Sequence, residues 1–203
     1  MVKKIVGTGV LLVLALALQA GVKMYTLKSP DGKVKLEVTA GQGIAYSLFY
    51  DGRLLLKPSR IALHTDLPEA DHWENIRITG TKQRHVSETV QAPFYRVKEF
   101  GIDCNELELR LNNGFSLLMR AYNDGMAYRF VAGRKGEMTV VEERAEFNFA
   151  DDFEAYIPYS TNPKDPWNMA FQNFYTKAPL TQYNTELPAF LPLTVDAGAV
   201  KLT

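Results

Sequence analysis

The chain has 203 residues, of which 46% are hydrophobic and 23% are charged, so it can bury a sizeable core and does not have the composition of a disordered protein. Its 23 basic and 23 acidic residues give a formal net charge of zero. The sequence shows no basic stripe interleaved with aromatic residues, which argues against nucleic acid as a partner.

The first twenty residues differ in composition from the rest of the chain. Two lysines precede a run of apolar and small residues over 5–18, and the run leads to Ala20. This is the pattern of a secretory signal peptide cleaved near Ala20, and the alternative is a membrane anchor. The run is shorter than the roughly 20 residues that span a bilayer, and no Cys at the junction offers a site for lipid attachment. We predict a signal peptide over 1–20, a mature domain over 21–203 that is periplasmic or secreted, and no membrane attachment after cleavage.

From Tyr25 onward, apolar and polar residues alternate in short runs, which is typical of half-buried β-strands. Turn-forming pairs and triplets separate these runs; they are Asp31-Gly32, Asp51-Gly52, Asn112-Asn113-Gly114 and Asp124-Gly125. The last two turns predict a three-stranded meander of Glu106–Leu111, Phe115–Tyr122 and Met126–Val131. The whole pattern predicts an all-β fold, an antiparallel β-sandwich.

Two stretches interrupt the strand pattern. The segment 66–74 contains Pro68, His72 and Trp73, and the segment 159–166 contains turn formers and two prolines. Both are expected to be loops, and loops on rigid sheets often carry function. Near the C-terminus, Phe190–Val195 is predicted as a strand, 196–198 as a turn and 200–203 as the opening of a further strand. We expect from this ending that the sequence is a fragment of a longer protein or a reading frame cut short.

Cys104 is the only cysteine in the sequence. It stands in the run Ile102-Asp103-Cys104-Asn105-Glu106, which has no basic or His neighbour that would activate a thiol. We therefore expect a buried strand cysteine and no internal disulfide in the exported protein.

Several segments resemble the N-terminal domain of glycoside hydrolase family 97. They are Leu27–Leu36, Tyr46–Gly52, Leu56–Leu63 and Met119–Phe130, and the last contains Tyr-Asn-Asp-Gly followed by an aromatic-Arg-aromatic return. Their order and spacing carry the resemblance, which runs from about Leu27 to Thr203.

The resemblance implies a β-supersandwich, similar to the galactose-mutarotase-like fold, that packs against a following (β/α) barrel and helps wall the active site. The family contains α-glucosidases and α-galactosidases, some inverting and some retaining, that depend on calcium. Their catalytic carboxylates lie on the barrel, so no catalytic residue is expected in this chain. One metal ligand comes from the N-terminal domain, and its Glu position is occupied here by Gln172. An amide carbonyl suits calcium but adds no charge, so calcium binding by this chain is expected to be weak or absent.

The carboxylates of the chain itself give no catalytic pair by inspection. Glycoside hydrolysis needs two carboxyl groups flanking the bond. Glu106 and Glu108 lie two residues apart on one strand face, and we expect both to be solvated.

Aromatic residues crowd the segment that follows the proline-rich loop. Sugar rings stack on exposed aromatic faces, so Trp167 and Phe171, together with Asn173, are the candidate substrate-binding residues. Phe174, Tyr175 and the more distant Trp73 belong to the same aromatic set. The alternative is that these aromatics form core, or a seam that packs against a barrel.

Two functions remain open from the sequence. The first is a non-catalytic portion of an exported α-glycosidase, with an α-linked oligosaccharide and a (β/α) barrel as partners. The second is a stand-alone periplasmic module that binds carbohydrate or another partner, and a mutarotase-like epimerase is a weaker third.

Overall fold

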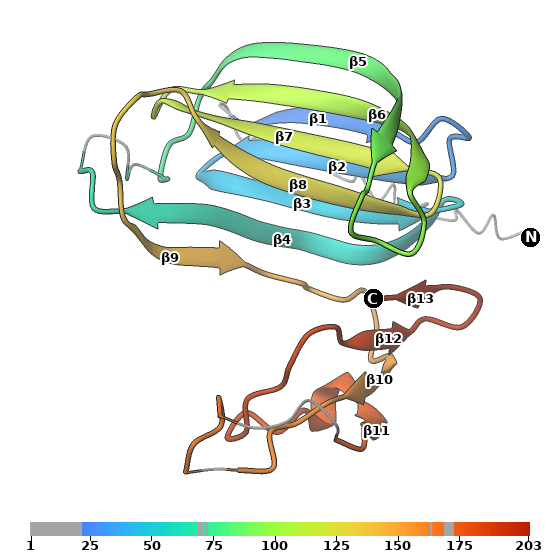
Figure 1. Cartoon of the computed structure of the whole chain (residues 1–203). Helices are drawn as coiled ribbons and strands as arrows, with labels where there is room; N and C mark the ends of the chain where they lie inside the picture. The colour runs from blue at the N-terminus through green and yellow to red at the C-terminus, as the bar shows by residue number, and fades with distance from the viewer. Residues whose placement is uncertain (1–21, 69–70, 72, 163, 169–172) are drawn as a thin grey trace, which may run out of the picture.

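The computed structural model describes residues 22–68, 71, 73–162, 164–168 and 173–203, and its regular secondary structure consists almost entirely of antiparallel strands (Figure 1). The predicted signal peptide therefore lies outside the described residues. Among the described residues, no helix is both long and apolar enough to cross a membrane.

The first sheet contains five strands in the order β1-β2-β3-β4-β9. These are β1 (Lys23–Lys28), β2 (Val34–Gly41), β3 (Gly43–Tyr50), β4 (Arg53–Thr65) and β9 (Val140–Ala145). All neighbours are antiparallel, and β1 and β9 form the two edges.

The second sheet contains four strands in the order β5-β6-β7-β8. These are β5 (Ile78–Gln91), β6 (Glu99–Leu111), β7 (Phe115–Tyr122) and β8 (Gly125–Ala132). The predicted meander is confirmed, because β6, β7 and β8 pair in succession. The two sheets stack face to face as a sandwich (Figure 1), which confirms the fold class.

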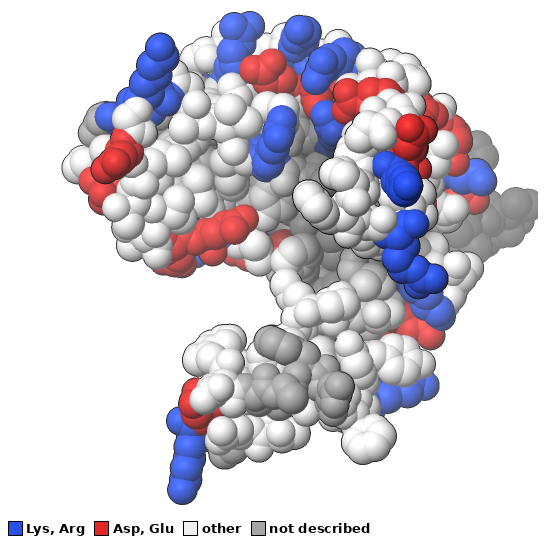
Figure 2. Space-filling view, viewed as in Figure 1, with Lys and Arg blue, Asp and Glu red and all other residues white. Residues whose placement is uncertain are grey.

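A smaller sheet forms a lobe, defined here as residues 150–203, that lies beside the sandwich (Figure 1). Its strands are β10 (Glu154–Ile157), β11 (Thr176–Pro179), β12 (Thr194–Asp196) and β13 (Lys201–Leu202), in the order β11-β10-β12-β13. A single 3-10 turn, η1 (Leu180–Gln182), follows β11. Figure 2 shows a hollow between the sandwich and the lobe.

The core lies between the two large sheets and follows from the period-two pattern. Along β2 and β7, buried and half-buried residues alternate strictly, as a strand with one covered face requires. Leu36, Leu109 and Leu117 are fully enclosed, and Ala155 and Ile157 of β10 join the same cluster. The lobe is therefore continuous with the sandwich core.

Two tight turns show why the local sequence predicted hairpins. Asp51 and Gly52 have φ values of 48° and 79°, the pair of positive angles that a type I′ hairpin turn needs between β3 and β4. Gly114, with φ of 84°, closes the hairpin between β6 and β7 in the same left-handed region.

The predicted strand over Phe190–Val195 is wrong in its first half. The strand β12 begins at Thr194, and the residues before it form a loop. Pro192 has no N–H to give to a ladder, so the sheet pairing starts after it.

Trp73 belongs to the core, which was the alternative to a sugar contact for the aromatic residues. Its side chain is 6% exposed, its ring packs 5.1 Å from Phe130, and its indole N–H donates to the carbonyl of Leu63 at 2.9 Å. The prediction of a buried Cys104 is also confirmed, because its side chain is enclosed on β6.

Candidate functional site

The predicted substrate-binding residues fall on the lobe, and the structure describes two of the three. Trp167 is 72% exposed, so its indole face is open to solvent. Asn173 is half-buried, and its side-chain amide donates to the carbonyl of Tyr159 at 2.9 Å. Phe171 and the predicted metal ligand Gln172 lie outside the described residues.

The loop that leads from Tyr159 to Trp167 is held at its start by several contacts around Tyr159. Its ring packs against that of Tyr183 in a tilted arrangement with centroids 5.5 Å apart, and its hydroxyl accepts a hydrogen bond from the N–H of Asn184 at 2.7 Å. The hydroxyl of Ser160 donates to the carbonyl of Pro166 at 3.2 Å, which closes the loop that leads to Trp167. Asn173 and the chain before Trp167 are thus both tied to one anchored segment.

Two further aromatic residues of the lobe are open to solvent. Phe174 is 100% exposed and Tyr175 is also exposed, so neither is core in this domain. The interpretation that these two residues form part of the core is therefore wrong. A seam against another domain and a sugar contact remain open for them.

Arg53 joins the lobe to the sandwich. Its guanidinium donates to the carbonyl of Ala197 at 2.6 Å and lies 5.4 Å from the ring centroid of Phe153. Phe153 in turn contacts Phe149 edge-on. The start of β4 is therefore tied to the turn between β12 and β13 and to Phe153.

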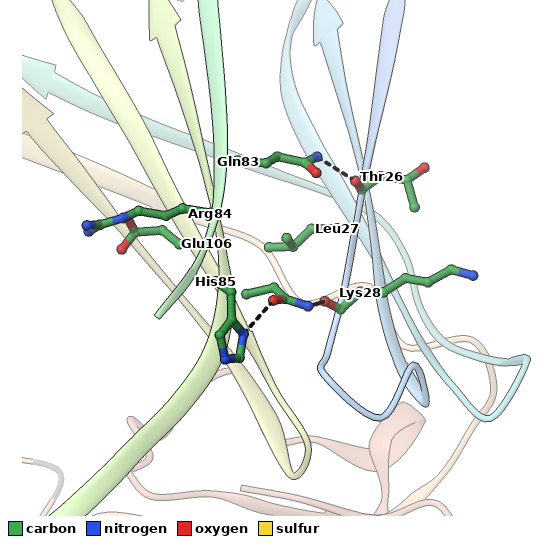
Figure 3. Close-up of a pocket in the computed structure, with 8 residues that line it drawn as sticks. Thr26, Leu27, Lys28, Gln83, Arg84, His85 and Glu106 are labelled. Atoms are coloured by element: carbon green, nitrogen blue, oxygen red, sulfur yellow. Dashed lines mark hydrogen bonds and ion pairs between the residues drawn. The ribbon is translucent and has the colours of Figure 1, made fainter. Parts of the chain in front are cut away.

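A groove of about 490 Å³ lies where β1 of the first sheet meets β5 and β6 of the second (Figure 3). Its side-chain amides are engaged with the protein itself. Gln83 donates to the carbonyl of Thr26 at 3.0 Å, and Asn105 donates to the carbonyl of Lys28 at 2.8 Å. These groups hold the two sheets together, so they are not free to order a ligand.

Glu106 is the most enclosed carboxylate in the described part of the chain, and the prediction that it is solvated is wrong. Its side chain is 5% exposed, and Nε of Arg84 and Nε of Arg120 lie 2.7 and 2.8 Å from its two carboxylate oxygens. The three residues lie opposite one another on β5, β6 and β7. The flanking guanidinium groups, rather than water, solvate the carboxylate.

The charge state of Glu106 follows from this arrangement. Burial by itself would raise the pKa of the carboxyl, but the hydrogen bonds and charges of Arg84 and Arg120 outweigh burial and hold the pKa below its ordinary value. Glu106 is thus an anion at neutral pH and is unsuited to the role of general acid.

No group of three or more His, Cys, Asp or Glu side chains among the described residues is arranged to hold a metal ion. Gln172, the predicted metal ligand, lies outside the described residues, so calcium binding stays a prediction.

Solved structures share this fold. A Glycoside Hydrolase Family 97 enzyme from Pseudoalteromonas in complex with panose superposes with a TM-score of 0.66 over 84% of this chain and 26% of its own, at 19% identity. A beta-arabinopyranosidase superposes with a TM-score of 0.64 over 75% of this chain and 26% of its own, at 22% identity. The fold is therefore that of a β-sandwich domain found within glycosidases.

Sequence comparison gives the family. The family model described as "Glycosyl-hydrolase 97 N-terminal" matches residues 27–203. The chain belongs to this family, which confirms the resemblance read from the motifs.

Two relatives show how much of a full-length protein this chain covers. A "Retaining alpha-galactosidase" of Bacteroides thetaiotaomicron is 40% identical over 189 residues, which are 90% of this chain and 28% of the relative. A "Probable retaining alpha-galactosidase" of Streptomyces bingchenggensis is 26% identical over 76% of this chain and 24% of its own length. The chain thus spans about a quarter of the relatives that it matches.

Proposed function

We propose that this chain is the non-catalytic N-terminal domain of an exported α-glycosidase, where it contacts an α-linked oligosaccharide and shapes an active site completed by a (β/α) barrel. The observation that carries the proposal is the family match over 27–203 in a chain that spans 28% of a retaining alpha-galactosidase. Export rests on the signal-peptide pattern over 1–20.

The lobe is the part of the domain that we assign to the sugar. Trp167 offers an open aromatic face, and the C–H face of a sugar ring packs on such a surface. Asn173 stands on the anchored segment of the same lobe. The 40% identity to a retaining alpha-galactosidase favours an α-galactoside over an α-glucoside.

We also propose that calcium binds this chain weakly or not at all. Gln172 would supply a neutral carbonyl oxygen, and calcium sites usually combine six to eight oxygen ligands including carboxylates. The remaining ligands would have to come from the barrel.

The sugar contact can be tested by titrating the chain with raffinose, an α-galactoside, in a calorimeter. We expect Trp167→Ala to weaken binding about tenfold or more, because the stacking face is lost. Phe147→Ala is the matched control, since Phe147 is an exposed aromatic residue outside the lobe. Equal binding by the parent and Trp167→Ala would contradict the assignment of the sugar to Trp167.

The non-catalytic role has its own measurement. The chain should release no p-nitrophenol from p-nitrophenyl α-galactoside or α-glucoside above the buffer rate. Turnover by the chain would overturn this part of the proposal. The coding sequence downstream of Thr203 separates the domain of a longer enzyme from the alternative, a stand-alone periplasmic carbohydrate-binding or interaction module.

A further inference from the structure

The strand β1 is an edge of the first sheet, it carries a lysine at each end, and no bulge interrupts its register. It pairs with β2 without a bulge from Lys23↔Ala40 to Lys28↔Lys35. An edge strand with a regular register is a template for pairing with another chain. The opposite edge, β9, differs because its ladder to β4 is shifted at His64/Thr65.

The direction of the free backbone groups on β1 follows from the antiparallel ladder. The carbonyls of Thr26 and Lys28 accept hydrogen bonds from the second sheet, so they point away from β2. In an antiparallel strand the N–H of a residue points to the same side as its C=O. Thr26 and Lys28 therefore direct both a donor and an acceptor toward the open side of the sheet.

Two side-chain amides cover this side. Gln83 of β5 and Asn105 of β6 occupy the carbonyls of Thr26 and Lys28. Figure 3 shows Gln83 facing Thr26 across the groove. The amides come from the sheet that faces β1, so they close the edge and join the two layers at the same point.

A second pair of residues orients one of these amides. Because Nδ2 of Asn105 donates to Lys28, its Oδ1 is turned to Nδ1 of His85, 3.1 Å away. The other ring nitrogen of His85 lies 3.1 Å from a carboxylate oxygen of Asp103. With a proton on Nδ1, the imidazole donates to Oδ1 of Asn105 and braces the amide in the orientation that lets it donate to β1.

We propose that Gln83 and Asn105 act as an edge latch that prevents β1 from pairing antiparallel with β1 of a second copy of this chain. An antiparallel strand pair across a two-fold axis satisfies the free groups of both edges at once. When the latch is removed, the backbone groups of Thr26 and Lys28 are available to that second copy.

The test is the mass of the protein in solution, measured by size-exclusion chromatography with light scattering over a range of concentrations. Gln83→Ala combined with Asn105→Ala should dimerise with a dissociation constant at least about tenfold below that of the parent. Gln91→Ala should behave as the parent, because Gln91 lies on the same strand but donates to Glu99 rather than to β1.

A rescue variant identifies the surface that associates. Thr26→Pro removes the outward N–H from an edge strand, where proline is tolerated, and in the double variant it should restore the mass of the parent. A double variant with unchanged mass, or a dimer that persists with Thr26→Pro, would overturn the proposal. If the double variant does not fold, Asn105→Ala and Gln83→Ala are measured singly, each with the same two outcomes.

Discussion

Replacing Glu106 with glutamine tests whether the enclosed carboxylate stabilises the second sheet. The substitution keeps the shape of the side chain but removes its charge. One of the two flanking arginines then faces an amide N–H₂ in place of an acceptor. The perturbation is thus confined to the Arg84–Glu106–Arg120 row described above.

The expected loss follows from the exposure of each arginine. Arg120 is 24% exposed, and a hydrogen bond between charged groups at such a site contributes about 1.5–3 kcal/mol. Arg84 is 53% exposed, so water can replace its contact, and its share is about 0.2–1 kcal/mol. Since glutamine keeps one acceptor, we expect Glu106→Gln to lower the free energy of unfolding by about 2 kcal/mol.

Urea denaturation measures this loss, and Glu108→Gln is the matched control. Glu108 lies on the same face of β6, and the hydroxyl of Ser116 donates to it at 3.3 Å. We expect about 0.5 kcal/mol or less for the control. A difference between the two variants of less than about 0.5 kcal/mol would refute the assigned role of the row.

The pH dependence of the same comparison has a definite sign. The folded-state pKa of Glu106 is lowered from its ordinary value of 4.5. Its contribution is therefore fully present above about pH 4.5 and is lost as the pH falls through the folded-state pKa. The stability gap between parent and Glu106→Gln should stay constant over neutral pH and shrink below about pH 4.5. A gap that persists undiminished in acid would show that shape, not charge, underlies the loss.

Arg53 and Cys104 give two further predictions. Arg53→Gln should lower the free energy of unfolding by about 1 kcal/mol, because the hydrogen bond to Ala197 is lost. Hydrogen exchange should then be accelerated more in 194–202 than in β6. Equal acceleration in both segments would count against a local role of Arg53. Burial raises the pKa of the Cys104 thiol, so it should react with a disulfide reagent only when urea unfolds the chain; rapid labelling of the native protein would disprove its enclosure.

The sandwich could be predicted from sequence because its determinants are local. Alternation along β2 and β7 and the turns at Asp51-Gly52 and Gly114 involve residues that are neighbours in the chain. The boundary of β12 is also set locally, but by a backbone property that the apolar pattern does not reveal. The apolar residues before Thr194 suit a strand, whereas Pro192 has no N–H to donate to a ladder, so pairing begins after it.

Only part of the Arg84–Glu106–Arg120 row can be predicted from the spacing of residues around a turn. Glu106 and Arg120 are equidistant from Asn113, so their pairing across the β6–β7 hairpin follows from the turn, which the sequence does reveal. Arg84 reaches Glu106 across the longer connection between β5 and β6, whose register no turn motif specifies. A prediction of the whole row would have needed that register, and without it Glu106 looked solvated.

The distribution of engaged and open side chains suggests where the function of this domain lies. In the sandwich, three polar groups at the groove and beside it are used internally, since Gln83 and Asn105 bond to β1 and Glu106 is held by two arginines. In the lobe, by contrast, Trp167 is open while the segment beneath it is anchored through Tyr159. A rigid support that presents an open aromatic face is suited to positioning a ligand. The lobe, rather than the sandwich, is therefore the part of this domain where substitutions should change recognition without changing the fold.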